Sequence, residues 1–222
     1  MDYSVDDIVR KAKIAIDQNV SSQELASLGD TDTLTLDEII RSKVEDAARL
    51  VEEGAAHYLL DGGQNFGGAI ERSGMPAGAG RIKLDSTFLR LVVFQMSDWV
   101  KAATDVITED DPAYLLQRSR YAGIRGNSER PAVAIIHTTD GPVLEYYGSS
   151  DTSIVKRFLY IPIPKIETKG TSSPNDDTIA LCPKLYRAVV YRLASMTAAI
   201  IGASDVAAML LGTSNELAGV VS

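Results

Sequence analysis

The single cysteine, Cys182, is the residue with the clearest potential chemistry, because a thiolate is a strong nucleophile. It directly precedes Pro183, where a helix is predicted to begin, and a helix N-terminus lowers the pKa of a nearby thiol. A hydrolase of this kind also needs a base beside the thiol, and the chain has only His57 and His137. His57 falls in a predicted helix and His137 at the end of a predicted strand, and no spacing brings either one to Cys182. We expect a small buried side chain and keep a cysteine-dependent hydrolase as a second hypothesis.

Two other kinds of segment could bind phosphate or metal, but their spacing does not fit. Segment 61–80 holds seven glycines, yet it lacks the Gly-Lys-Ser or Gly-Lys-Thr of a phosphate-binding loop and follows a predicted helix. We expect a flexible loop there. The acidic clusters at 109–111 and 176–177 do not alternate ligands as a calcium loop does. The sequence therefore predicts no catalytic residue, no cofactor and no metal ion.

Four arginines lie within thirteen residues of this acidic chain, at Arg118, Arg120, Arg125 and Arg130. They could form a solvated loop, a docking surface for an acidic neighbour, or a contact with nucleic acid. Docking is the functional hypothesis, because complementary charge orients partners. We take these four arginines as candidate partner-interface residues.

The elements that must position these residues follow from hydrophobic spacing and caps. Helical spacing or capping residues predict helices at 4–19, 21–29, 36–60, 97–107, 111–120, 183–202 and 204–211. The helix at 36–60 would be one continuous rod. A hairpin is predicted from strands 131–137 and 143–147 around Asp140-Gly141, and a further strand at 155–163. Pro162 and Pro164 cannot donate to a ladder, so the end of that strand should lie at a sheet edge.

This order of elements predicts an α+β protein in which both chain ends form a helical bundle around a β-rich insertion. The bundle would comprise residues 1–80 and 178–222, with the glycine-rich loop at 61–80, and the inserted middle would comprise residues 81–177. The longest stretch without a charge has twelve residues, 193–204, which is short of the about 20 apolar residues of a membrane span. The net charge of −8 disfavours a non-specific grip on nucleic acid.

The layout resembles a known family. The closing segment LCPKLYRAVVYRLA at 181–194, followed by DVAAMLL at 205–211, is similar to the head–tail connector (neck ring, or adaptor) proteins of tailed bacteriophages. The hairpin from RPAVAII at 130–136 to VLEYY at 143–147 resembles, more narrowly, ring proteins of crAss-like phages that infect Bacteroides. Adaptors of the family are usually smaller and mostly helical.

The resemblance implies a non-enzymatic virion protein, made in the host cytoplasm and built into the neck. It implies a ring of twelve copies that contacts the portal and other neck or tail proteins and lines the channel for double-stranded DNA, without sequence-specific binding. An acidic channel lets a polyanion slide, because it repels phosphate. In such a ring the strand with Phe158 and Tyr160 could pair across the interface, which adds both residues to the candidate interface. A third hypothesis is a binding module with a small-molecule pocket around Trp99 and Tyr146.

Overall fold

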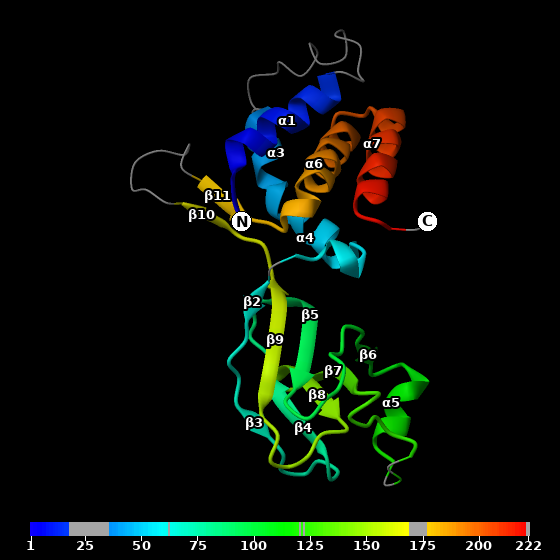
Figure 1. Ribbon diagram of the computed structural model, residues 1–222. Coiled ribbons are helices and arrows are strands. Elements are labelled where there is room, and N and C mark those ends of the chain that lie inside the picture. Colours follow the sequence, from blue (N-terminus) through cyan, green and yellow to red (C-terminus); the bar gives the residue numbers. More distant parts are fainter. Residues whose placement is uncertain (18–35, 62, 120, 122, 169–176, 221–222) are drawn as a thin grey trace. The chain divides into compact units, whose positions relative to one another are not determined.

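The computed structural model describes residues 1–17, 36–61, 63–119, 121, 123–168 and 177–220 (Figure 1). The chain forms two compact units. The terminal unit combines Met1–Asp61 with Ile163–Ser222, and the middle unit is Gly62–Pro162. The chain thus changes unit after Asp61 and after Pro162, whereas the sequence-based boundaries fall after residues 80 and 177.

The terminal unit packs its helices around one apolar helix. Its helices are α1 (Val5–Asp17), α3 (Leu36–Ser42), α4 (Val44–Gly54), α6 (Tyr186–Ile200) and α7 (Ser204–Leu217), with 3-10 turns η2 (His57–Leu59) and η4 (Pro183–Leu185). Helix α6 contacts α1, α4 and α7, as its apolar circumference predicts. Two buried hydroxyls link α6 and α7: Ser195 donates to the carbonyl of Ala207 at 2.7 Å, and Ser214 donates to that of Ala188 at 2.8 Å.

Three short strands join the two ends of the chain in the same unit. They are β1 (Asp2–Ser4), β10 (Ile166–Thr168) and β11 (Asp177–Ala180), in the antiparallel order β1-β11-β10. Beyond the strands, the Leu181 amide donates to the Met1 carbonyl at 3.0 Å. Arg41 of α3 bridges this sheet to α1, because it binds Asp177 at 2.8 Å and also Asp6.

The predicted fold class is therefore wrong in its main statement. The chain ends do not form a helical bundle: the described residues form eleven strands in three sheets, and three of those strands belong to the terminal unit. The fold is mixed α/β and rich in strands. These end strands are only three or four residues long, which is too short for an alternating pattern to stand out in the sequence.

The middle unit is built from two sheets with a shared core. One has the order β3-β4-β8-β7-β6 and the other has the order β2-β9-β5. Their strands are β2 (Gln64–Asn65), β3 (Ile70–Glu71), β4 (Ala79–Lys83), β5 (Phe88–Met96), β6 (Ile107–Thr108), β7 (Ala132–Thr138), β8 (Gly141–Tyr147) and β9 (Val155–Pro162).

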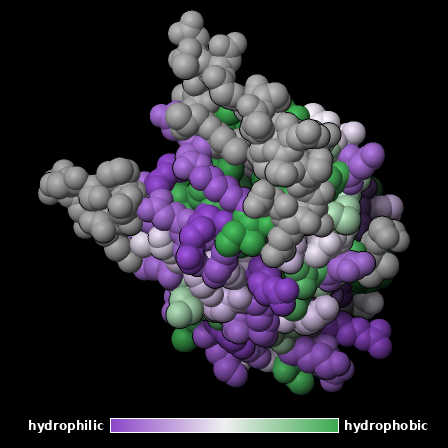
Figure 2. All heavy atoms as spheres, turned by 90° about the horizontal axis from the view of Figure 1, so that it is seen from above, coloured by the Kyte–Doolittle hydropathy of each residue, from purple (hydrophilic) through white to green (hydrophobic). Residues whose placement is uncertain are grey.

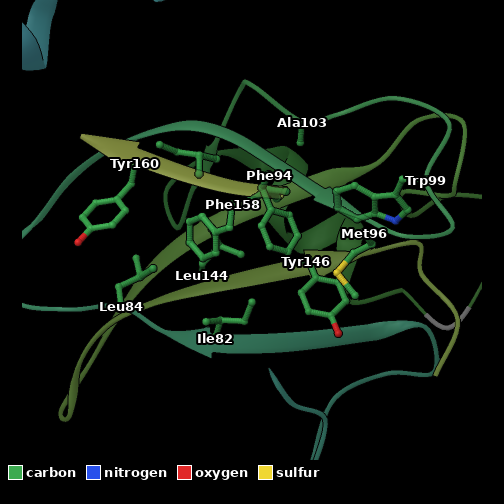
Figure 3. Close-up of a cluster of buried hydrophobic side chains, with 12 residues drawn as sticks. Ile82, Leu84, Phe94, Met96, Trp99, Ala103, Leu144, Tyr146, Phe158 and Tyr160 are labelled. Atoms are coloured by element: carbon green, nitrogen blue, oxygen red, sulfur yellow. The ribbon is translucent and has the colours of Figure 1, made fainter. Parts of the chain in front are cut away.

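Aromatic side chains fill the space between these two sheets (Figure 3). Phe94 of β5 lies at the centre, with its ring centroid 5.2 Å from that of Phe158, 5.5 Å from Trp99 and 5.6 Å from Tyr146. Such edge and tilted contacts add to the stabilisation from burial. Helix α5 (Pro112–Gln117), the one helix among the described residues of this unit, packs Tyr114 into a second cluster with Ala134, Ile136, Val143 and Tyr147 of the five-stranded sheet.

Several predicted elements are confirmed. The hairpin appears as β7 and β8 with the turn at Asp140-Gly141, and the strand at 155–163 appears as β9. Asp111 caps α5, because its carboxylate accepts from the Ala113 amide at 2.8 Å. Helices α1 and α6 also lie where they are expected.

Other predicted elements are wrong. The rod at 36–60 is broken at Lys43 and ends at Gly54, before η2. No helix forms at 97–107. Phe94 and Ala103 exchange two backbone hydrogen bonds, at 2.9 and 2.8 Å, so the chain after Met96 turns back to pair with β5. We call residues 97–103 the return arm. The glycine-rich segment contributes β2, β3 and the start of β4, and Gly212 lies inside α7. The predicted helix at 21–29 lies outside the described residues.

None of the helices in the described part of the chain has the length and hydrophobicity that crossing a bilayer requires. On the face seen in Figure 2 the described residues are mostly hydrophilic, with hydrophobic residues scattered between them.

Two glycines of the terminal unit give a matched test of backbone geometry. A Cβ would meet no atom within 4 Å at Gly202 or at Gly212, but Gly202 has φ +85° just after α6, whereas Gly212 is helical. We expect Gly212→Ala to raise the free energy of unfolding by about 1 kcal/mol and Gly202→Ala to lower it by about 1 kcal/mol. Urea denaturation measures both, and shifts of equal sign would contradict this account.

Candidate interaction surface

Helix α5 presents two leucines to solvent. Tyr114 and Gln117 point inward, whereas Leu115 is 73% exposed and Leu116 is 51% exposed. The capping bond from Asp111 fixes where the helix begins, and one turn later its last residues lead into a loop. Because Tyr114 and Gln117 occupy the inner side of α5, Leu115 and Leu116 face solvent.

A buried polar cluster attaches α5 to the sheet. Glu145 of β8 is 2% exposed, and its Oε2 accepts hydrogen bonds from the hydroxyls of Tyr114 at 3.0 Å and Tyr147 at 2.5 Å. Arg118 donates to the Tyr114 hydroxyl at 2.7 Å and lies 3.7 Å from Glu145 Oε1. Burial raises the pKa of Tyr147 and of Tyr114, and the nearby Glu145 carboxylate raises both further. Both phenols therefore stay neutral donors to the carboxylate.

The loop after α5 is held by side-chain amides. Gln117 is buried, and its Oε1 accepts from the Gly126 amide at 2.7 Å. Asn127 Oδ1 accepts from the Arg130 amide at 2.9 Å and closes the turn before β7. The far side of the loop is joined to the return arm, because the Val100 amide donates to the Ser128 carbonyl at 2.9 Å. The last part of the loop, at 126–130, is thus fixed at several points.

Apolar and basic side chains gather on this segment. Tyr121 is 61% exposed and Ile124 is 51% exposed, so with the two leucines four large hydrophobic side chains face solvent within ten residues. Residues 112–128 include three arginines and no Asp or Glu, and exposed acidic residues flank this stretch at 109–111 and 129. We call this set the arginine–leucine surface: Leu115, Leu116, Arg118, Tyr121, Ile124, Arg125 and Arg130.

This composition is typical of a protein interface. Large exposed apolar patches mark contact sites, and four large apolar side chains are exposed within this one short segment. Arginine and tyrosine are enriched where binding energy concentrates, because both combine a flat apolar body with polar donors. The surface suits an apolar, acidic protein partner.

The arginines predicted as interface residues fall on this surface where the structure describes them. Arg118 and Arg130 are exposed, Arg125 is half-buried, and Arg120 lies outside the described residues. Phe158 and Tyr160 do not join them: they are 3% and 5% exposed, inside the core, on the central strand of their sheet. Strand β9 already pairs with β5 and β2, so these two side chains do not lie on a free edge.

Cys182 precedes η4, but its surroundings differ from those of an activated nucleophile. It is 4% exposed, and its backbone amide donates to Glu52 Oε1 at 2.9 Å. Burial, together with the adjacent Glu52 carboxylate, raises the pKa of the thiol to about 12. Burial also raises the pKa of Glu52. A catalytic thiol needs the opposite shift.

Trp99 and Tyr146, which could have lined a small-molecule pocket, lie in the core of the middle unit. They are 4% and 1% exposed, and Trp99 Nε1 donates to the Gly148 carbonyl at 3.0 Å, so both rings serve the packing of that unit. Across the described ranges, no group of three or more His, Cys, Asp or Glu side chains is placed to hold a metal ion.

Neither protein-family models nor curated proteins give a match to this sequence.

The polar cluster beneath the surface was not predicted from the sequence. A signal for it exists: Glu145 is the one charge in the apolar strand VLEYY, and Tyr114 and Arg118 stand one helical turn apart. What the sequence does not show is that β8 passes beneath α5.

The Glu145 cluster gives a stability prediction. Glu145→Gln replaces an acceptor of two phenol hydrogen bonds by an amide and leaves Arg118 without its carboxylate, so we expect the free energy of unfolding to fall by about 2 kcal/mol. Urea denaturation provides the measurement. Glu71→Gln is the matched control, because Glu71 pairs with Arg81 on the exposed surface, and it should unfold like the wild type. Equal unfolding of all three proteins would contradict a role for the cluster.

The environment of Cys182 gives a reactivity prediction. A thiol with a raised pKa is protonated at about pH 8, so we expect iodoacetamide to label the folded protein far more slowly than the denatured protein. Mass spectrometry of the labelled chain provides the readout, with urea-unfolded protein as the control. Labelling of the folded chain at the rate of a free thiol would show that Cys182 is accessible and activated.

Proposed function

We propose that this protein is a structural subunit of a tailed-phage virion: a head–tail connector that forms a homo-oligomeric neck ring of the crAss-like kind. The ring would contact the portal and other neck or tail proteins and surround the passing double-stranded DNA. The observation that carries the proposal is the arginine–leucine surface. An exposed apolar and basic face, whose helix α5 is held by buried hydrogen bonds, suits a protein that acts by contacting other proteins.

The position of the resembling segments also supports this proposal. The two segments at 181–194 and 205–211 correspond to η4 with α6 and to α7, and the hairpin corresponds to β7 and β8. These segments supply the central helix α6 and the helix α7 that packs on it in one unit, and the middle of the larger sheet in the other. The likeness therefore concerns parts that organise both units.

The distribution of charge is compatible with a DNA conduit. Residues 1–61 carry 14 acidic and 6 basic side chains, so the whole net charge of −8 belongs to this segment. Acidic side chains repel phosphate and allow DNA to pass without being gripped.

The competing functions have less support. The raised pKa of the Cys182 thiol argues against a cysteine hydrolase, and the burial of Trp99 and Tyr146 in the core argues against a ligand pocket formed by them.

The purified full chain tests the proposal by its state of association, alone and mixed with a portal from the same virion. We expect native mass spectrometry to give a closed oligomer, with twelve copies as the expected number, and electron microscopy to show a ring stacked on the portal. Electron microscopy also serves as the control for charge-driven aggregation, because aggregates have no fixed copy number or closed shape. A chain that stays monomeric and never joins the portal would contradict the proposal.

A further inference from the structure

We propose that the arginine–leucine surface is the face by which one copy of the chain holds a second copy, and that it docks on the acidic outer side of helix α4 of that copy. This inference rests on the proposed ring and names the two faces that would close it.

Charge complementarity identifies the second copy as the partner. The middle unit, which carries the arginine–leucine surface, has 11 acidic and 11 basic residues, whereas residues 1–61 have an excess of eight acidic side chains. Each chain therefore offers an acidic segment to the basic surface of another chain. Complementary patches of this kind fix orientation and suppress wrong pairings.

Helix α4 matches the surface in both charge and apolar content. Asp46, Leu50 and Glu53 are spaced by four and three residues, which places them on one side of the helix, and all three are exposed. Leu50 is 44% exposed, so this side offers an apolar side chain between two carboxylates, of which Asp46 also pairs with Lys43 at 3.3 Å. The arginine–leucine surface offers the reverse arrangement, leucines beside guanidinium groups.

Duplex DNA fits the surface less well than a protein does. Phosphate contacts need basic and polar donors, and the exposed Leu115, Leu116 and Ile124 contribute nothing to them. Burying these side chains against a protein removes apolar area from water, which is favourable.

Two different faces make a heterologous contact. Each copy then binds one neighbour with its arginine–leucine surface and another neighbour with its α4 side, and such contacts close into a ring when the rotation allows. A heterologous contact also permits a test that a self-complementary one does not, because each face can be disabled separately.

The test uses full-length variants that each alter one face. The surface variant is Leu115→Ser with Arg125→Glu, and the helix variant is Leu50→Ser with Glu53→Lys. The control matched to the surface variant is Ile154→Ser with Arg157→Glu, which replaces an aliphatic side chain and reverses an arginine charge at exposed residues of the middle unit outside the surface. Thermal melting first establishes that all three fold like the wild type.

We expect sedimentation to show association weakened by about 100-fold in each face variant and unchanged in the control. An equimolar mixture of the two face variants retains one intact pair of faces, so it should form a heterodimer and no larger species.

The remaining outcomes overturn the inference in distinguishable ways. Face variants that assemble like the wild type would refute the assignment of these two faces but not the proposed ring. A wild type that stays monomeric would refute both the assignment and the ring. A surface variant that assembles normally but no longer retains a duplex DNA bound by the wild type would assign the surface to DNA and refute the second copy as its partner.

Discussion

The pairing of segments far apart in the chain is the constraint on which both units depend. In the terminal unit, Tyr3 of β1 lies opposite Ile179 of β11. In the middle unit, Gln64 of β2 lies opposite Tyr160 of β9. The first pairing forms one unit from two ends of the chain, and the second brings the start of the middle unit beside its end. Closing such long loops costs chain entropy, which the buried cores must offset.

The candidate surface owes its order to a buried charge. A carboxylate in an apolar interior is stable only when hydrogen bonds satisfy it, and two tyrosines and an arginine do so for Glu145. Two of these partners come from α5 and its end, so satisfying the carboxylate also orients the helix. Leu115 and Leu116 are then directed outward because Tyr114 and Gln117 occupy the inner side. The exposure of the two leucines therefore follows from where α5 is attached to the sheet.

The elements predicted well from the sequence are those whose signals are local. Asp140-Gly141 defines a hairpin turn, and Asp111-Pro112 defines a helix start, whatever the rest of the chain does. The failures concern contacts between distant residues. The stretch after Met96 has helical spacing, but backbone bonds between Phe94 and Ala103 make it a return arm. The prolines predict a sheet edge at the end of β9, and at Pro162 the strand pairs only with β5. Phe158 and Tyr160 lie earlier in β9 and belong to the core, so their choice as interface residues was wrong. Arginine clustering is visible in the sequence, but the exposure of the leucines beside it is not, since that exposure depends on the sheet beneath α5.

The β2–β9 pairing has a consequence for how the chain can vary. Residues opposite each other in an antiparallel pair have Cα atoms about 5 Å apart, so the entry and exit of the middle unit are neighbours. The whole stretch between two such points can be removed or exchanged by recombination while only a short turn is needed to rejoin the flanks. The middle unit can thus be inserted or removed as one piece. A shorter chain that keeps only the terminal helices and their small sheet would still contain one complete folded unit.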